Sequence, residues 1–470
     1  MKKKNTTNNP FFKYLAFVLI LLSLMFLVLI YFIGILPIDY FLLLTAIIGV
    51  TDIILVYRLL KKGRKKILSS IISIIISALL AIGIVYEINT IDFLKMLGAT
   101  NYLTENYVVL VLDESTYKDI TDLSNKDVGF LELGHDSSPA KKEIAKKVIV
   151  NYELYDSTTT IRDALLNRRV EAIILEETYY AMINEEEESF STQSRVIYRF
   201  SVDVEIEEIQ NNVDVLNQPF SIYISGIDTY GNISSASRSD VNIIITINPK
   251  TNKILLTTIP RDYYVPLHNK GYSDKLTHAG IFGVTTSQKT IENLLNTEIN
   301  YYFKVNFTSL IKIVDALGGI SVDSKYSFTS VDGYYYSKGM NKLNGEKTLS
   351  FARERKAFFE GDRTRGQNQQ DVLIAILNKA TDPSIIVKYN NLLNAIEGNF
   401  VTNADNKKIT DFIKMQINEN PKWEIESISL DGFDAYEYTY TSKNMQLYVM
   451  KPDIKTVEIA KEKIKEIYKG

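Results

Sequence analysis

Four arginines and four acidic residues lie within the segment FARERKAFFEGDRTRGQNQQD, residues 351–371. A solvated helix surface usually mixes Lys with Glu. This segment prefers Arg, whose planar guanidinium binds a phosphate or a carboxylate through two hydrogen bonds. Arg353 and Arg355 stand two residues apart in this segment. Asp362, Arg365 and Gln369 lie around the start of an expected helix. The segment therefore predicts a site that holds an anion.

Further charged residues stand at the ends of expected strands earlier in the chain. Asp228 ends the strand in SIYISGID, Arg261 follows the strand ILLTTIP, and Lys275 precedes Leu-Thr-His. Arg238 and Asp240 precede the strand VNIIITI, and a spacing of two places both on one face of an extended segment. We expect these side chains to meet in one site.

Several carboxylates and several arginines together suit a phosphate ester bound with a divalent cation. Mg²⁺ takes one or two carboxylates and completes its shell with water and phosphate oxygens. A single Asp-Arg neighbour is more often a surface ion pair worth ~0–1 kcal/mol. A buried group of five arginines, however, would be costly without anionic ligands. With three histidines and no cysteine in the chain, no Ser, Cys or His arrangement indicates a covalent enzyme intermediate.

The elements that must position these residues predict an α/β fold. From residue 216 to 470, strands rich in Ile, Val, Tyr and Phe are mixed with amphipathic helices, which favours an α/β/α sandwich. The apolar segments VNIIITI, FTSLIKIVDAL and DVLIAIL are expected to form its core, with the lining of an apolar channel as the alternative.

Residues 100–212 are expected to form a separate small α/β module. Strands such as YVVLVLDES and EAIILEE flank the helix TIRDALLNRRV, the acidic run INEEEESFSTQS (residues 183–194) is expected to be a surface loop, and VIYRFSVDVEIEE an edge strand. Two interpretations stay open: a spacer and protein-contact domain without chemistry, or a ligand-binding or docking domain.

Residues 1–90 differ in composition from the rest. Three apolar runs, which begin at residues 14, 38 and 67, are each long enough for the ~20 residues that cross a bilayer. Lys and Arg cluster before the first run and between the second and third, whereas the loop near Pro37 has none. The positive-inside rule therefore predicts a cytoplasmic N-terminus and a large part of the chain outside the membrane. That location and the net charge of −3 argue against nucleic acid as a partner.

At this point several motifs resemble the LytR-CpsA-Psr family. They are GIDTYG, SRSDVNIIITINPKTNKILLTTIPRDYYV, KLTHAG, VDALGGISVD, LNGEKTLSFARER and GDRTRGQNQQ, in the family's order. The three spans and the intervening module further resemble the capsule-type members, in which that module is called the accessory domain.

The resemblance implies a membrane-anchored transferase of a Gram-positive cell wall. Such enzymes move a glycopolymer, here expected to be capsular polysaccharide, from a polyprenyl-pyrophosphate carrier to peptidoglycan through a phosphodiester. It implies Mg²⁺ or Mn²⁺ as cofactor, and other capsule-assembly proteins as further partners. A regulator that binds the carrier lipid and a polyprenyl-pyrophosphate pyrophosphatase are the alternatives.

The resemblance also distributes roles among the residues. It assigns the metal to Asp228 and Asp240. The pyrophosphate is expected on Arg238, Arg261, Lys275, Arg353, Arg355, Arg365 and Gln369. Asp228, Asp362, Arg365 and Arg261 are the expected catalytic residues, with Asp228 or Asp362 as the base. Many members have a second basic residue where Asn368 stands in this chain, which leaves one charge fewer at the rim of the site.

Overall fold

The computed structural model describes residues 10–34, 36, 38–61, 66–96, 102–134, 136–205, 213–230, 233–382 and 398–470. Its chain divides into two compact units. The first holds the three N-terminal helices and α14 (Asn406–Glu419), although the sequence places α14 within the expected 216–470 domain. The second holds the remaining described elements.

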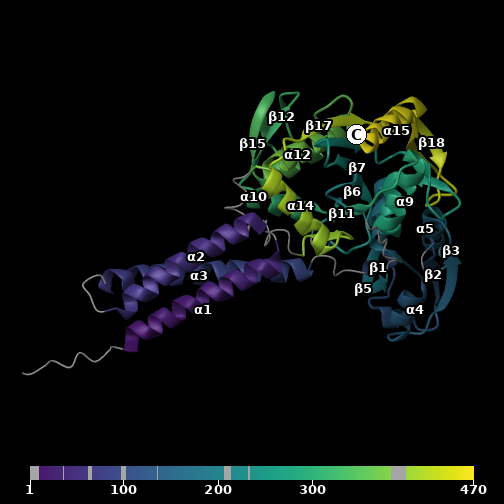
Figure 1. The fold of residues 1–470 in the computed structure, drawn as a ribbon. Helices are drawn as coiled ribbons and strands as arrows, with labels where there is room; N and C mark the ends of the chain where they lie inside the picture. The colour runs from purple at the N-terminus through teal and green to yellow at the C-terminus, as the bar shows by residue number, and fades with distance from the viewer. Residues whose placement is uncertain are drawn as a thin grey trace, which may run out of the picture. The chain divides into compact units, whose positions relative to one another are not determined.

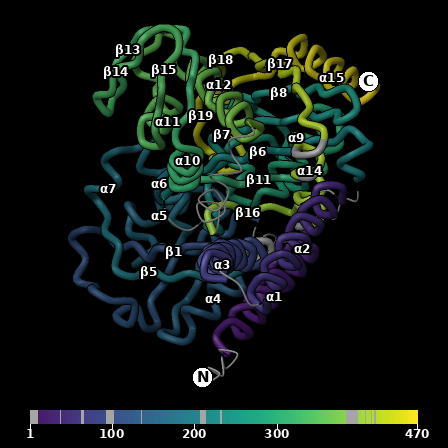
Figure 2. Tube along the Cα trace, turned by 60° about the vertical axis from the view of Figure 1, so that its left-hand side comes forward, coloured from purple at the N-terminus to yellow at the C-terminus, as the bar shows by residue number. Residues whose placement is uncertain are grey.

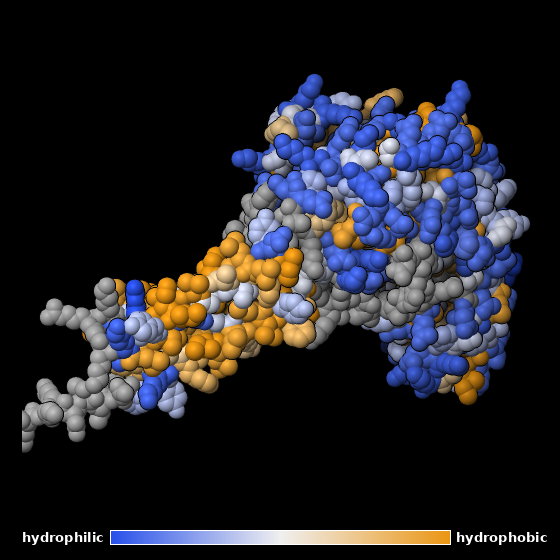
Figure 3. Space-filling view, viewed as in Figure 1, coloured by the Kyte–Doolittle hydropathy of each residue, from blue (hydrophilic) through white to orange (hydrophobic). Residues whose placement is uncertain are grey.

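Three long apolar helices dominate the first unit. They are α1 (Pro10–Ile33), α2 (Ile38–Leu60) and α3 (Lys66–Met96), and each is long and apolar enough to span a membrane. Leu19, Leu55 and Leu80 are buried where the helices pack together. Most of their other apolar side chains are exposed, and Figure 3 shows this surface as hydrophobic. The three expected membrane helices are confirmed as helices of the required length and composition.

A five-stranded module opens the second unit. Its five strands lie in the sheet in the order β3-β2-β4-β1-β5. Along the chain, its elements are β1 (Tyr102–Leu112), η1 (Ile120–Leu123), β2 (Asp127–Leu131), α4 (Ser138–Ala145), β3 (Asn151–Tyr155), α5 (Thr158–Leu166), β4 (Ala172–Glu176), α6 (Glu177–Glu186), α7 (Phe190–Gln193) and β5 (Ser194–Glu205). Side chains of β1 alternate between two cores, so that Val108 and Leu110 face α5 and α6 whereas Tyr107 and Val109 face α4.

The acidic run at residues 183–194 is not the expected loop. Its first residues complete α6, and its last third forms α7. The loop prediction was wrong because the charged residues mask a helical pattern: Tyr179, Met182 and Ile183 recur at helical spacing and are buried beneath the acidic surface.

A six-stranded module forms the rest of the second unit. Its mixed sheet has the order β16-β11-β6-β7-β8-β17. The strands are β6 (Phe220–Ile227), β7 (Ser239–Asn248), β8 (Lys253–Thr258), β11 (Tyr301–Val305), β16 (Phe400–Thr402) and β17 (Glu424–Ser429). Four small two-stranded pairings surround it: β9 (Tyr264–Pro266) with β10 (Ser273–Lys275), β12 (Ile320–Ser324) with β15 (Gly339–Leu343), β13 (Phe328–Thr329) with β14 (Tyr335–Tyr336), and β18 (Gly432–Tyr438) with β19 (Gln446–Pro452).

Helices cover both faces of the six-stranded sheet, as Figures 1 and 2 show. One layer contains α8 (Leu276–Ala279), η2 (Gly280–Phe282), α9 (Val284–Leu295) and α15 (Ile454–Lys469). The other contains α10 (Phe307–Ala316), α11 (Gly345–Arg353) and α12 (Asp362–Ala380). This arrangement confirms the expected α/β/α sandwich.

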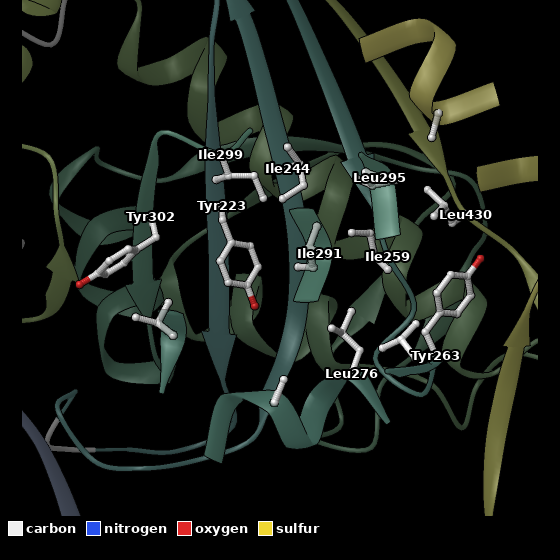
Figure 4. Close-up of a cluster of buried hydrophobic side chains, with 14 of the residues drawn as sticks. Tyr223, Ile244, Ile259, Tyr263, Leu276, Ile291, Leu295, Ile299, Tyr302 and Leu430 are labelled. Atoms are coloured by element: carbon white, nitrogen blue, oxygen red, sulfur yellow. The ribbon is translucent and has the colours of Figure 1, made fainter. Parts of the chain in front are cut away.

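The layer of α9 and α15 encloses the main core of this module. Tyr223 of β6 and Ile244 of β7 pack against Ile291 and Leu295 of α9, and all four are at most 1% exposed. Figure 4 shows these side chains converging from adjacent strands and from the helix. The opposite face of the sheet is covered by α10, α11 and α12 (Figures 1 and 2).

Strand direction explains why charged residues gather at one edge of this sheet. β6 and β11 run parallel, and β7 runs antiparallel to both β6 and β8. The ends of β6, β8 and β11 therefore meet the start of β7 at the same edge. Asp228 follows β6, Arg238 and Asp240 are at the start of β7, and Arg261 comes three residues after β8.

Candidate functional site

A cavity of about 840 Å³ opens at this edge, between the sheet and the layer of α10, α11 and α12. Part of its wall is apolar and includes residues of all three apolar segments noted in the sequence: Val241, Ile243, Leu310, Ile313, Leu373 and Ile376. The rest of the wall is charged and includes Asp228, Arg238, Asp240, Arg261, Arg353, Arg355 and Arg365, with Gln369 beside them. The cavity is therefore amphipathic, with five arginines at its polar end.

Asp240 is the most deeply buried carboxylate of the site, with 7% of its surface exposed. Its Oδ1 accepts hydrogen bonds from Arg261 Nη1 at 3.0 Å and from Thr277 Oγ1 at 2.8 Å. Burial alone would raise the pKa of Asp240, but Arg261, Arg238 and Arg365 lower it to about 2. Its buried Oδ2 has no hydrogen-bond partner among the described residues. An ionised oxygen is thus left free to bind a cation.

Asp362 joins two of the arginines. Its Oδ1 lies 2.5 Å from Arg365 Nη2 and 3.7 Å from Arg261 Nε. Arg365 is only 8% exposed, and burial together with the neighbouring Arg261 lowers the pKa of its guanidinium. Two buried guanidiniums side by side repel each other, so an anion bound between them would be stabilised by both.

Asp228 is a second carboxylate in the wall of the large cavity. Arg353 Nη2 is 3.8 Å from its Oδ1, and the Arg353 guanidinium stacks 4.3 Å from the ring centre of Phe307. Burial and the charge of Asp240 raise the pKa of Asp228. A cation shared by the two carboxylates would remove this repulsion.

These two carboxylates fit a magnesium site with few protein ligands. Nowhere in the described ranges are three or more His, Cys, Asp or Glu side chains grouped so as to hold a metal ion. Mg²⁺ does not need such a cage, because one or two carboxylates plus phosphate oxygens and water suffice. The unpartnered Oδ2 of Asp240 and the raised pKa of Asp228 are consistent with this ligand set.

A second, smaller cavity of about 190 Å³ adjoins the same charged residues. It shares Asp240, Arg261, Arg365 and Gln369 with the large cavity. Its own lining includes Asp362, Arg363 and Asp431. Arg261 and Arg365 thus lie where the large amphipathic cavity meets the smaller one.

Lys275, an expected pyrophosphate ligand, and Asn368, noted as a departure from the family pattern, each have a structural partner. Lys275 Nζ lies 3.3 Å from Asp262 Oδ1 and is not among the residues that line either cavity. Asn368 is 6% exposed and donates through Nδ2 to the Phe351 carbonyl oxygen at 3.2 Å. Asn368 therefore anchors α12 to α11 and does not reach the cavity rim.

Three residues at the end of α6 and just beyond it line the large cavity but were not predicted from the sequence, and Glu185 makes the closest contact with the site. Glu185 of α6 accepts hydrogen bonds from Arg238 Nη1 at 2.6 Å and from Arg238 Nη2 at 2.7 Å. Asn184 and Glu188 line the large cavity with it. No spacing could have signalled this contact, because it joins two modules across 53 positions of sequence.

The comparisons with known proteins agree with the motifs. The LytR_cpsA_psr family model matches residues 179–463. A polyisoprenyl-teichoic acid–peptidoglycan teichoic acid transferase TagU of Bacillus anthracis is 39% identical over 211 residues, which are 44% of this chain and 69% of that protein. The TagU of Bacillus subtilis is 40% identical over 186 residues, 39% of this chain and 60% of its own. A crystal structure of Bacillus subtilis TagV has 29% identity and a TM-score of 0.46, and the match covers 54% of this chain and 98% of that one.

Proposed function

The chain belongs to the LytR-CpsA-Psr family, and from this premise we propose that it is a membrane-anchored phosphotransferase that links a glycopolymer to peptidoglycan. The observation that carries the proposal is the large cavity, which is apolar along one wall and carries five arginines at its polar end. A polyprenyl pyrophosphate has the same two parts, a long apolar tail and a doubly charged head. The names of the relatives support a polymer-to-peptidoglycan transfer of this kind.

In the proposed complex, the tail of the donor occupies the apolar wall formed by β7, α10 and α12. The pyrophosphate lies against five arginines of the large cavity: Arg238, Arg261, Arg353, Arg355 and Arg365. The largely buried guanidiniums of Arg238, Arg261 and Arg365 favour a bound anion, and the exposed Arg353 and Arg355 add positive charge to the same cavity. Gln369 adds a polar contact at the point where the two cavities meet. Lys275 does not line the cavity, so it contributes through Asp262 and Arg261.

Asp228 and Asp240 would hold a Mg²⁺ or Mn²⁺ ion. When bound, such an ion offsets negative charge on the pyrophosphate and on the departing phosphate. Arg261 and Arg365 then stabilise the charge that develops on the transferred phosphoryl group, in a buried site where such contacts are strong.

The two cavities suggest how the acceptor approaches. Phosphoryl transfer places the attacking and leaving oxygens roughly in line on opposite sides of the phosphorus. If polyprenyl phosphate leaves toward the large cavity, the acceptor hydroxyl enters from the small one. Asp362 lines the small cavity whereas Asp228 lines the large one, which favours Asp362 as the base. A bond forms between the acceptor oxygen and the phosphorus, the bond to polyprenyl phosphate breaks, and Asp362 takes the hydroxyl proton.

The site is proposed to work outside the cell membrane. The Lys and Arg residues before α1 and between α2 and α3 support a cytoplasmic N-terminus, and with three crossings the second unit would lie outside. The relatives' names favour a teichoic acid as polymer, whereas the three-span layout favours capsular polysaccharide. We propose capsular polysaccharide, and a competition between the two donors in one reaction decides between them.

The decisive experiment uses the full-length protein in detergent or nanodiscs. It is incubated with a polyprenyl-pyrophosphate-linked glycan and peptidoglycan fragments, with and without Mg²⁺, and both released polyprenyl phosphate and wall-linked glycan are measured. We expect Mg²⁺-dependent transfer that falls by at least ~100-fold in Arg365→Ala, as for the loss of one buried transition-state contact.

Arg168→Ala is the matched control, because Arg168 is an exposed arginine paired with Glu114 in the five-stranded module. Release without glycan attachment would identify a pyrophosphatase instead. Donor binding without release would identify a carrier-lipid-binding regulator. Full activity of Arg365→Ala would refute the assignment of the site.

A further inference from the structure

The five-stranded module supplies part of the wall of the large cavity. Asn184, Glu185 and Glu188 lie at the C-terminal end of α6 and just beyond it, and all three line the cavity. Among them, Glu185 contacts a predicted phosphate ligand directly. The five-stranded module therefore reaches the charged site, although one interpretation of its sequence was a spacer without chemistry.

The geometry of the pair leaves Arg238 able to bind a second anion. Glu185 binds the guanidinium end-on, with Oε2 on Nη1 and Oε1 on Nη2. An end-on carboxylate uses one N–H of each terminal nitrogen. A guanidinium has five N–H donors, so the edge formed by Nε and one terminal nitrogen stays available for a phosphate oxygen.

The burial of Arg238 also favours a fixed geometry for its guanidinium. The Arg238 side chain is 19% exposed and that of Glu185 is 58% exposed. An arginine side chain that is free to rotate would lose conformational entropy each time it bound a ligand. Arg238 is spared much of that loss because Glu185 already orients it.

The position of α6 is itself fixed from both modules. Tyr179, Met182 and Ile183 anchor the helix in a core that also contains Ile281 of the six-stranded module. Thr178 Oγ1 donates to the Ala236 carbonyl oxygen at 3.0 Å, two residues before Arg238. The helix that carries Glu185 is thus attached to the same stretch of backbone that carries Arg238.

We propose that Glu185 is a positioning residue for Arg238, through which the five-stranded module completes the pyrophosphate site. This inference rests on the proposed function, in which Arg238 binds the pyrophosphate of the donor. Glu185 holds the guanidinium with its free edge toward the cavity, and the bound pyrophosphate then accepts hydrogen bonds from that edge while Glu185 keeps the other.

The direction in which Glu185→Gln changes the affinity for pyrophosphate distinguishes two roles: orientation of Arg238, or competition of the Glu185 carboxylate with the bound anion. Removing a negative charge near an anion site strengthens anion binding if charge alone matters. It weakens binding if the carboxylate orients the arginine. We expect the affinity of the full-length protein for inorganic pyrophosphate to fall about tenfold in Glu185→Gln, which is the scale of one well-oriented charge-assisted hydrogen bond. Isothermal titration calorimetry measures it.

Two further variants serve as controls on the same region. Glu188→Gln removes a charge from the same cavity wall without a contact to Arg238 in the structure, and it should bind pyrophosphate slightly more tightly. Glu177→Gln changes an exposed residue of α6 that pairs with Arg199, and it should leave binding unchanged. Unaltered thermal unfolding would show that the Glu185 variant is folded.

A double-variant cycle tests whether Glu185 acts through Arg238. In an Arg238→Ala background, Glu185→Gln should have no further weakening effect, because the residue that it positions is gone. In the transfer assay, Glu185→Gln should raise KM for the donor more than it lowers kcat.

The outcomes of these experiments decide whether Glu185 positions Arg238 or competes with the bound anion. Tighter pyrophosphate binding in Glu185→Gln would overturn the positioning role and would indicate a carboxylate that competes with the ligand. Additive effects in the double variant would also overturn it, as would a wild-type protein that binds no pyrophosphate. Wild-type binding of pyrophosphate without any glycan transfer would refute only the proposed function.

Discussion

Lys304 of β11 is a buried lysine at the junction of the two modules, and it supports a quantitative prediction. Its side chain lies on the core face of β11, is 5% exposed, and donates through Nζ to the Ser235 carbonyl oxygen at 2.8 Å. Burial lowers the pKa of Lys304 from 10.5 to about 8. The unfolded chain keeps the ordinary lysine value, so the folded protein binds this proton less tightly.

The lowered pKa sets both the size and the pH range of the effect. A difference between 10.5 and about 8 corresponds to about 3 kcal/mol, because one pKa unit equals ~1.4 kcal/mol. Below pH 8 both states carry the proton, and the full cost of burying the charge opposes folding. Between about pH 8 and 10.5 only the unfolded state keeps the proton, so the stability contributed by this site rises with pH.

Lys304→Met removes the titrating group. We expect the free energy of unfolding of the wild type, minus that of the variant, to rise by about 3 kcal/mol between pH 7 and 10.5. Guanidinium denaturation in detergent measures both values. Trp423, the single tryptophan of the chain, reports on the six-stranded sheet because it directly precedes β17.

Taking the difference cancels the other groups that titrate in this range. Lys342→Met, at an exposed position of β15, should give a difference that does not change with pH. If the difference in free energy of unfolding for Lys304→Met also did not change with pH, the reasoning would be refuted. Such a result would mean that the lysine is as easily protonated in the folded protein as in the unfolded chain.

Two further predictions concern the walls of the site. Leu310→Trp should fill the apolar part of the large cavity and raise KM for a long-chain donor at least tenfold. Inorganic pyrophosphate should still bind to this variant in calorimetry. An equal loss of affinity for both ligands would argue against a site for the apolar tail there. Gly280→Ala would place a Cβ 2.6 Å from the Ser239 backbone nitrogen and 2.8 Å from the Ser237 carbonyl oxygen. This clash with rigid backbone should cost about 1–3 kcal/mol in thermal unfolding and should lower transfer, because the same backbone carries Arg238; unchanged stability would show that the strand can move.

Much of the site follows from local patterns in the sequence. Asp228, Arg238 and Arg261 were placed at strand ends because alternating and β-branched runs define where each strand starts and stops. Strand ends gather at one edge of a sheet, so their common position could be expected without coordinates. Helical spacing likewise placed Asp362 and Arg365 together on the first turn of α12.

The sequence could not show contacts that depend on how elements pack. Glu185 was hidden in an acidic run that was interpreted as a loop, and its partner belongs to another module. The family resemblance implied Lys275 as a pyrophosphate ligand. Its pairing with Asp262 depends on side-chain directions that no spacing encodes.

The apolar segments show the same limit. VNIIITI contributes Val241 and Ile243 to the cavity and Ile244 to the core on the opposite face of the sheet. Core and channel were posed as alternatives, and the alternation of a strand lets one segment serve both.

The shared core around Ile281 has a consequence for how this part of the protein unfolds and how it can be recombined. Ile281 belongs to the six-stranded module by sequence but is fully buried among residues of the five-stranded one. Backbone hydrogen bonds between Thr104 and both Ser234 and Ala236 join the modules a second time. Two parts connected in this way should melt in one calorimetric transition. Genetic excision of the five-stranded module would then expose an apolar surface and loosen the backbone leading to Arg238, so we expect that this module cannot be replaced as an independent cassette in this chain.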